Sequence, residues 1–234
     1  MHYFPLGLPL LFALLLLFLA LIILIEINLL TYAFHKMGVN HRYVFALLLL
    51  SLLGSYINIP VYRLPPEPIH SGGTVVFFGV PYMVPMVTEA PGTLIAVNLG
   101  GAIIPTILAA YLIVKNGLYL RALVGTAIAA IIFHHMAHLV PGVGIAVPIL
   151  VPALVALAIG LILSWWHAPA LAYIVGTLGT LIGADLANLA KLRGLGAPVA
   201  SIGGAGTFDG IFLTGILAVL LAGLMGPRSQ PWRI

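Results

Sequence analysis

The sequence predicts an all-α membrane protein with about seven transmembrane helices. Of the 234 residues, 62% are hydrophobic and only 6% are charged, a composition that soluble globular domains do not have. Apolar runs of roughly 18 residues or more, the length of a helix that crosses a bilayer, recur along the chain. Both faces of these runs are apolar, which favours helices and excludes an outer-membrane barrel.

The helices are expected to form a single polytopic membrane domain that covers residues 1–234. The first apolar run is too long for a signal peptide and lacks a basic start, so we expect it to remain as a helix. Residues 60–91 are rich in proline and are expected to form an irregular or β-like surface connector between the second and third helices. The predicted helices span residues 6–32, 43–59, 93–114, 118–139, 145–165, 169–192 and 206–225.

Lysine and arginine indicate the orientation in the membrane. Counted by alternate loops, three basic residues fall on one side, namely Arg63, Lys191 and Arg193. The other side carries Lys36, Arg42, Lys115, Arg121, Arg228 and Arg233. The positive-inside rule therefore predicts a cell-membrane protein with a cytoplasmic C-terminus. If the number of spans between Arg121 and Lys191 differs by one, the loop before the last helix becomes cytoplasmic instead.

Composition also excludes several classes of function. The chain has no cysteine, which excludes disulfides, iron–sulfur clusters and thiol nucleophiles. No cluster of Lys and Arg with interleaved aromatic residues is present, so no nucleic-acid partner is expected. The expected partners are membrane lipid and a substrate, and the sequence leaves the oligomeric state open.

The two aspartates of the chain, Asp185 and Asp209, both lie in apolar sequence. A carboxylate at membrane depth costs several kcal/mol unless it is paired, protonated or wetted. The two lie on consecutive predicted helices, where they can face one another and share a proton. One then acts as a base toward water and the other as an acid toward a carbonyl oxygen. We therefore expect a catalytic pair, with no cofactor. Glycines near the second aspartate would open the backbone to a substrate: Gly203, Gly204, Gly206 and Gly210.

Two other interpretations of the aspartates stay open. In the structural one, Asp185 bonds Asn188 or reaches toward Lys191 or Arg193, and Asp209 caps the last helix. In the other, both bind H⁺ or Na⁺ in a small transporter or channel. The segments IAVNLGGAIIPTILAAYLIV and VASIGGAGTFDGIFLTGILAVLL each place Gly-Gly-Ala before an apolar helix. This similarity is either a duplicated broken helix, as in transporters, or a product of the glycine-rich composition.

A third candidate chemistry rests on histidines. His134 and His138 are four residues apart in a predicted helix, which is the spacing of helical zinc ligands. Together with Asp209, they would form the metal site of a zinc-dependent intramembrane hydrolase. His135 occupies the place of the glutamate that usually serves as general base, so water activation has no obvious base.

The segment GAGTFDGIFLTGILAVLLA resembles the Gly-x-Gly-Asp segment of the presenilin and signal-peptide-peptidase class of intramembrane aspartyl proteases. The resemblance maps Gly204, Gly206 and Asp209 onto that motif and Asp185 onto the partner aspartate. It departs from the motif by two residues inserted before Asp209. The resemblance implies an aspartyl endopeptidase that cleaves transmembrane peptide segments. The whole chain, including SLLGSYINIP and SIGGAGTFDGIFLTG, resembles an uncharacterised family of prokaryotic polytopic membrane proteins.

Overall fold

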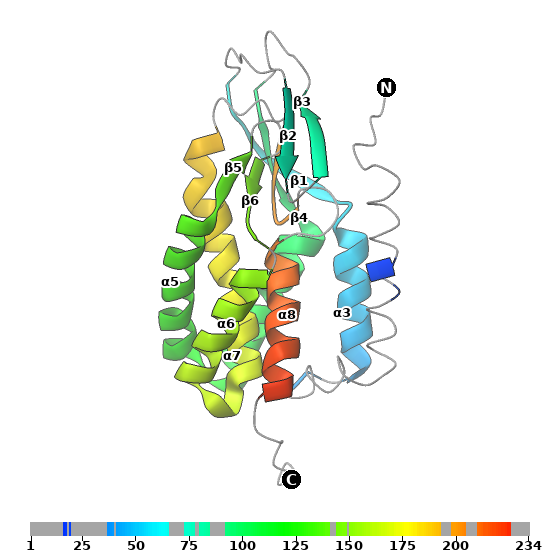
Figure 1. The fold of residues 1–234 in the computed structure, drawn as a ribbon. Helices are drawn as coiled ribbons and strands as arrows, with labels where there is room; N and C mark the ends of the chain where they lie inside the picture. The colour runs from blue at the N-terminus through cyan, green and yellow to red at the C-terminus, as the bar shows by residue number, and fades with distance from the viewer. Residues whose placement is uncertain are drawn as a thin grey trace.

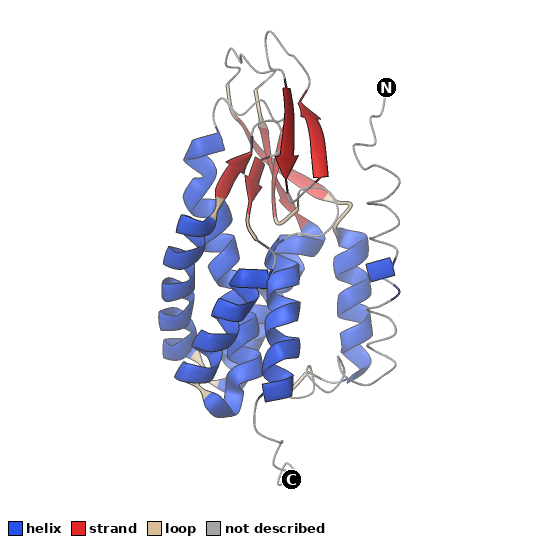
Figure 2. Ribbon diagram, in the orientation of Figure 1, coloured by secondary structure: helices blue, strands red, loops and turns tan. Residues whose placement is uncertain are grey.

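Helices form a bundle, and short strands lie at one end of it (Figures 1 and 2). The predicted first helix, residues 6–32, lies outside the described residues except at three positions. The computed structural model describes residues 16–17, 19, 37–39, 41–65, 73–77, 80–84, 92–140, 144–148, 150–192, 198–204 and 210–225.

The described elements are helices with groups of strands between them. The α-helices are α3 (His41–Gly54), α4 (Ile104–Asn116), α5 (Tyr119–Met136), α6 (Leu150–Leu163), α7 (Ala168–Gly179) and α8 (Gly210–Met225). The strands are β1 (Asn58–Arg63), β2 (Gly73–Phe77), β3 (Val80–Val84), β4 (Leu94–Asn98), β5 (His138–Val140), β6 (Gly144–Ala146) and β7 (Val199–Ile202). Two π-helices, η1 (Leu99–Ile103) and η3 (Thr180–Asp185), and two 3₁₀ segments, η2 (Trp165–His167) and η4 (Leu186–Leu192), adjoin the α-helices.

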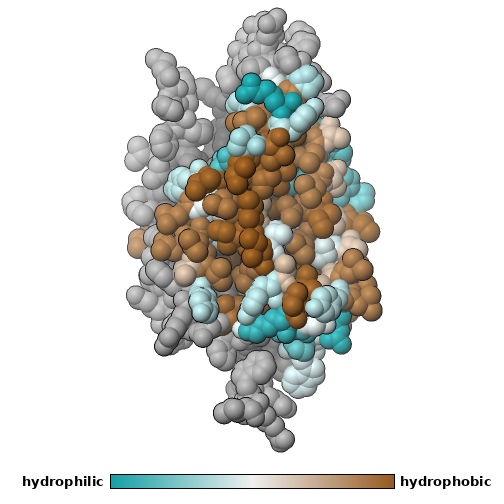
Figure 3. All heavy atoms as spheres, turned by 180° about the vertical axis from the view of Figure 1, so that it is seen from behind, coloured by the Kyte–Doolittle hydropathy of each residue, from teal (hydrophilic) through white to brown (hydrophobic). Residues whose placement is uncertain are grey.

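Three helical stretches are long and apolar enough to cross a membrane: Leu99–Asn116, Tyr119–Met136 and Trp165–Leu192. Figure 3 shows a broad apolar band on one face, with hydrophilic residues toward its two ends. These features support a membrane protein that is mostly helical. The predicted count of seven spans is not confirmed, because the other described helices are shorter and the first predicted helix lies outside the described residues.

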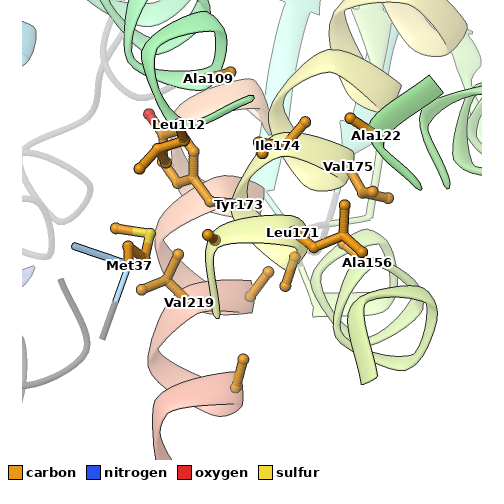
Figure 4. Packing of buried hydrophobic residues seen from close by; sticks show 14 of the residues in the cluster. Met37, Ala109, Leu112, Ala122, Ala156, Leu171, Tyr173, Ile174, Val175 and Val219 are labelled. Carbon is orange, nitrogen blue, oxygen red and sulfur yellow. The ribbon is translucent and has the colours of Figure 1, made fainter. Parts of the chain in front are cut away.

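Helix α7 lies at the centre of the bundle. All of its residues except Leu178 are buried, and it packs against α4, α5, α6 and α8. Figure 4 shows Leu171 and Val175 of α7 near Ala156 of α6 and Ala122 of α5. Small residues allow this close approach, as is usual where membrane helices pack without a hydrophobic driving force between them.

The main sheet has the strand order β1-β4-β7. Strand β4 is antiparallel to β1 and parallel to β7, while β2 pairs with β3 and β5 with β6. The predicted β-like connector, residues 60–91, contains most of β1 and all of β2 and β3. Strand β7 and helix α8 both follow the central helix in sequence, so the chain returns to the sheet before it re-enters the bundle.

Four predicted helix boundaries were wrong. The helix predicted over residues 145–165 begins only at Leu150, because residues 145–146 lie in β6. The second predicted helix ends at Gly54 and is followed by β1, and residues 94–98 of the third form strand β4. Helix α5 ends at Met136, because Ala137 has extended dihedral angles and Pro141 soon follows, which disfavours helical backbone before it. His138 therefore lies in β5, so His134 and His138 do not share one helix face.

Candidate functional site

The site is built where two strands pass into helices. Strands β4 and β7 are paired in parallel, with Val97 opposite Ile202. Each is followed by glycines and then by a helix, α4 after η1 and α8 after residues 205–209. Parallel strands present their carboxyl ends at the same edge, which is where open sheets with helices bind ligands. The Gly-Gly-Ala segments noticed in the sequence thus lie side by side.

Asn98 ties the strands together at this edge. Its side chain is fully buried, and its Oδ1 accepts a hydrogen bond of 2.8 Å from the Gly101 N–H, which caps η1. Its Nδ2 donates to the Ser55 carbonyl at 2.7 Å and to Asn58 Oδ1 at 2.9 Å. Ser201 Oγ of β7 donates to the same Asn58 oxygen at 2.6 Å. Both polar atoms of the Asn98 side chain therefore serve in holding η1, β1 and the turn after α3 together, and Asn58 extends the network to β7.

The glycine pair after β7 fits tightly against this cluster. Gly203 has φ +80°, in the left-handed region, and a Cβ there would lie 2.5 Å from Ala102 Cβ. A Cβ at Gly204 would lie 2.9 Å from the side chain of Asn98. Only glycine fits both positions without moving η1 or the side chain of Asn98. Of the predicted substrate-binding glycines, these two thus pack against η1, Gly210 begins α8, and Gly206 lies outside the described residues.

Asp185 contacts one of these glycines, Gly203. It is the last residue of the π-helix η3 and is half-buried. Its Oδ2 accepts a hydrogen bond from the Gly203 N–H at 3.1 Å. Gly203 therefore lies between Ala102 of η1 and Asp185 of η3, so both π-helical segments meet at one residue. Single π-helical turns are rare and are found frequently at functional sites.

The nearby amide and amine make a separate cluster. Asn188 is buried, and its Nδ2 donates to the carbonyls of Gly183 at 3.1 Å and Ala184 at 2.9 Å. Lys191 Nζ donates to Asn188 Oδ1 at 2.8 Å. The side-chain amide of Asn188 thus closes the end of the central helix, where η3 passes into the 3₁₀ segment η4.

Asp209 lies outside the described residues, in the segment 205–209. The residues that flank this segment are described. On one side, Gly203 is bonded to Asp185. On the other, α8 begins at Gly210 and packs against both η1 and η3. The described residues on either side of this segment are therefore Gly204 and Gly210.

The histidines of the predicted zinc site lie at the end of α5. His134 Nδ1 is buried with no hydrogen-bond partner within the part of the chain that is described, and its ring contacts that of His135 edge to face. His138 Nδ1 lies 2.6 Å from the Met136 carbonyl oxygen. The described residues contain no group of three His, Cys, Asp or Glu side chains that could hold a metal ion. The predicted third ligand, Asp209, is outside them.

Sequence reasoning singled out Asp185 but missed Asn58 and Ser201. In the sequence, Asn58 and Ser201 stand out only as polar residues beside apolar runs. Asn58 and Asn98 lie directly opposite each other across the β1–β4 pair, a register that the sequence pattern alone does not specify.

Comparison with known proteins gives one match. A family described as "Protein of unknown function (DUF1614)" matches residues 52–221, a range that includes the whole candidate site. No curated protein and no solved structure matches the chain.

Proposed function

Since the chain belongs to the DUF1614 family, whose function is unknown, we propose from the site itself that it is an intramembrane aspartyl hydrolase. Asp185 and Asp209 form the catalytic pair and share a proton. The observation that supports this proposal is the hydrogen bond from Gly203 to Asp185, because Gly203 comes shortly before Asp209 in the sequence.

The chemistry needs two carboxylates close enough to hold one proton between them. Asp209 directly precedes α8, and a helix N-terminus favours an anion. The ionised member takes a proton from water while the protonated member donates to the substrate carbonyl. The Gly-x-Gly-Asp resemblance of Gly204, Gly206 and Asp209 supports the same assignment.

The substrate class follows from the edge of the sheet. Among the described residues, β7 is paired on one side only, with β4. An extended peptide can add to such an edge through main-chain hydrogen bonds. Strand β7 leads directly into Gly203 and Gly204, so a peptide bound along it would pass close to Asp185. We propose an unwound transmembrane peptide segment as the substrate.

The orientation of the site is part of the proposal. With seven spans and a cytoplasmic C-terminus, the end of the bundle that carries the sheet and Lys191 faces outward. Lys115 and Arg121 lie at the opposite end, where α4 passes into α5. Asp185 then lies toward the outer leaflet of the cell membrane.

The decisive experiment incubates the purified protein with labelled transmembrane peptides and compares wild type with Asp185→Asn and Asp209→Asn. Asparagine at 185 can still accept the Gly203 hydrogen bond but cannot titrate, so folding should be retained. We expect each variant to lose about a thousandfold or more in cleavage rate.

A chelator should leave the wild-type rate unchanged. If both variants cut as fast as the parent, aspartyl chemistry is wrong. If the chelator abolishes cleavage, the zinc hydrolase with His134, His138 and Asp209 becomes the better proposal.

A second candidate function is an H⁺- or Na⁺-coupled transporter. Two observations favour it, namely the parallel strand–glycine–helix units of β4 and β7 and the buried Thr180 hydroxyl at the start of η3. This hydroxyl has no hydrogen-bond partner in the described part of the chain, and a hydroxyl beside irregular helix is a suitable cation ligand. Proteoliposomes loaded with a pH-sensitive dye test this function. Proton or Na⁺ flux that Asp185→Asn abolishes, without peptide cleavage by wild type, would favour the transporter.

A further inference from the structure

Three side chains meet at the end of the bundle opposite the sheet, where α5 begins and α6 passes into α7. Arg121 Nη1 donates a hydrogen bond of 3.0 Å to Ser164 Oγ, and His167 Nδ1 lies 3.4 Å from the same oxygen. Ser164 is only 6% exposed, whereas Arg121 and His167 are exposed. The buried Ser164 hydroxyl thus holds the exposed Arg121 guanidinium and His167 imidazole beside each other.

The charge of Arg121 is not matched by a carboxylate in the described part of the chain. A guanidinium has five N–H donors, and the partner that Arg121 has there is the neutral Ser164 hydroxyl. The whole chain has five acidic residues. Of these, Asp185 is the one that the structure describes, and it lies at the other end of the bundle. The remaining N–H donors of Arg121 thus have no carboxylate partner among the described residues.

The side chains around Arg121, Ser164 and His167 are of the kind found at the level of the lipid headgroups. Trp165 is 50% exposed and Trp166 67% exposed, directly between Ser164 and His167 in sequence. Exposed tryptophan is typical of the membrane interface, where its ring lies at headgroup level. Leu120 and Leu123, on either side of Arg121 in α5, are 72% and 68% exposed. The cluster thus lies where an apolar helix surface ends and polar groups begin.

We propose that Arg121, Ser164 and His167 bind the phosphate of an anionic glycerophospholipid, with Trp165 and Trp166 against its glycerol and upper acyl chains. The planar guanidinium pairs with two phosphate oxygens at once. When His167 Nδ1 accepts from the Ser164 hydroxyl, Nε2 carries the proton and donates to the phosphate. Basic pockets between helices on the cytoplasmic side bind lipid headgroups in this way. This inference does not depend on the hydrolase proposal.

Tryptophan fluorescence can be used to measure lipid binding at this cluster. The chain has three tryptophans, so Trp232→Phe leaves Trp165 and Trp166 as the fluorophores. This variant, in detergent micelles, is titrated with phosphatidylglycerol that carries bromine on its acyl chains. We expect saturable quenching, and we expect Arg121→Gln to weaken the apparent affinity tenfold or more. Brominated phosphatidylcholine should quench more weakly and should respond little to that substitution.

Lys115→Gln is the matched control, because it removes one positive charge at the same end of the bundle. Loss of a general surface charge weakens binding of anionic lipid about fivefold, so Lys115→Gln should stay within that range. Equal effects of the two substitutions, quenching that does not saturate, or reversal by soluble glycerol phosphate would each overturn the proposal. If Arg121→Gln fails to fold, Ser164→Ala takes its place, with an expected loss of severalfold because Arg121 and His167 lose their common anchor.

Discussion

Asn98 shows how much of the site depends on one neutral side chain. It is fully buried and bonds groups on η1, β1 and the turn after α3. A buried polar group in an apolar environment is stabilising only when its partners are all in place, since each unpaired group costs about 1–3 kcal/mol. Asn58 and Asn98 are 40 residues apart in sequence, so no local pattern predicted that they meet.

We predict that Asn98→Ala lowers the free energy of unfolding by roughly 3 kcal/mol, because it leaves Gly101 N–H, the Ser55 carbonyl and Asn58 Oδ1 without this partner. Unfolding in detergent measures the loss. Asn116→Ala is the control, since Asn116 makes one bond, to the Leu112 carbonyl, at a half-buried helix end. It should cost under about 1 kcal/mol. Equal losses would mean that the Asn98 network is not a stabilising one.

At the scale of elements, the π-helix η3 is held by its contact with α5. A Cβ at Gly183 would lie 2.2 Å from the Ala130 carbonyl oxygen and 2.6 Å from Ala130 Cα. These are backbone atoms within a helix, so they cannot move aside without moving α5. Gly183 thus sets how closely η3, and with it Asp185, lies against the bundle.

Gly183→Ala should therefore destabilise the protein by about 2–3 kcal/mol, as overpacking of a tight core does. It should also impair the proposed function, because η3 carries Asp185. Gly160→Ala provides a graded comparison, since a Cβ there meets its nearest neighbours at 3.0 Å, and its cost should be clearly smaller. Thermal unfolding of the two variants under the same conditions measures both losses of stability. A Gly183→Ala protein as stable as wild type would contradict the tight contact.

Elements also show what the sequence could predict. Most helices were predicted close to their observed positions, because apolar runs of that length have few alternatives. Residues 94–98 were predicted as helix and are strand β4, because a short apolar run looks alike in a buried helix and a buried strand. The partner that makes it a strand, β7, is about a hundred residues further along the chain. The π-helical form of η3 had no sequence signal at all.

On the scale of the whole molecule, the bundle has two different ends. One carries the sheet, Asp185 and Lys191, and the other carries Lys115, Arg121 and the exposed tryptophans. The count of basic residues predicts which of these ends faces the cytoplasm, and chemical labelling tests that prediction.

Because the chain lacks cysteine, single introduced cysteines can report the orientation. Tyr119→Cys and Ala190→Cys change exposed positions at opposite ends and leave every charge in place. A membrane-impermeant maleimide should label Ala190→Cys in intact cells and Tyr119→Cys only after the membrane is opened. Labelling of both from the same side would contradict the predicted topology, and the reverse pattern would place the candidate site toward the cytoplasm.

The bond between Asp185 and Gly203 joins the innermost helix of the molecule to the first residue beyond strand β7. A shift of that strand along its axis would therefore either break this hydrogen bond or move the Asp185 carboxylate with it.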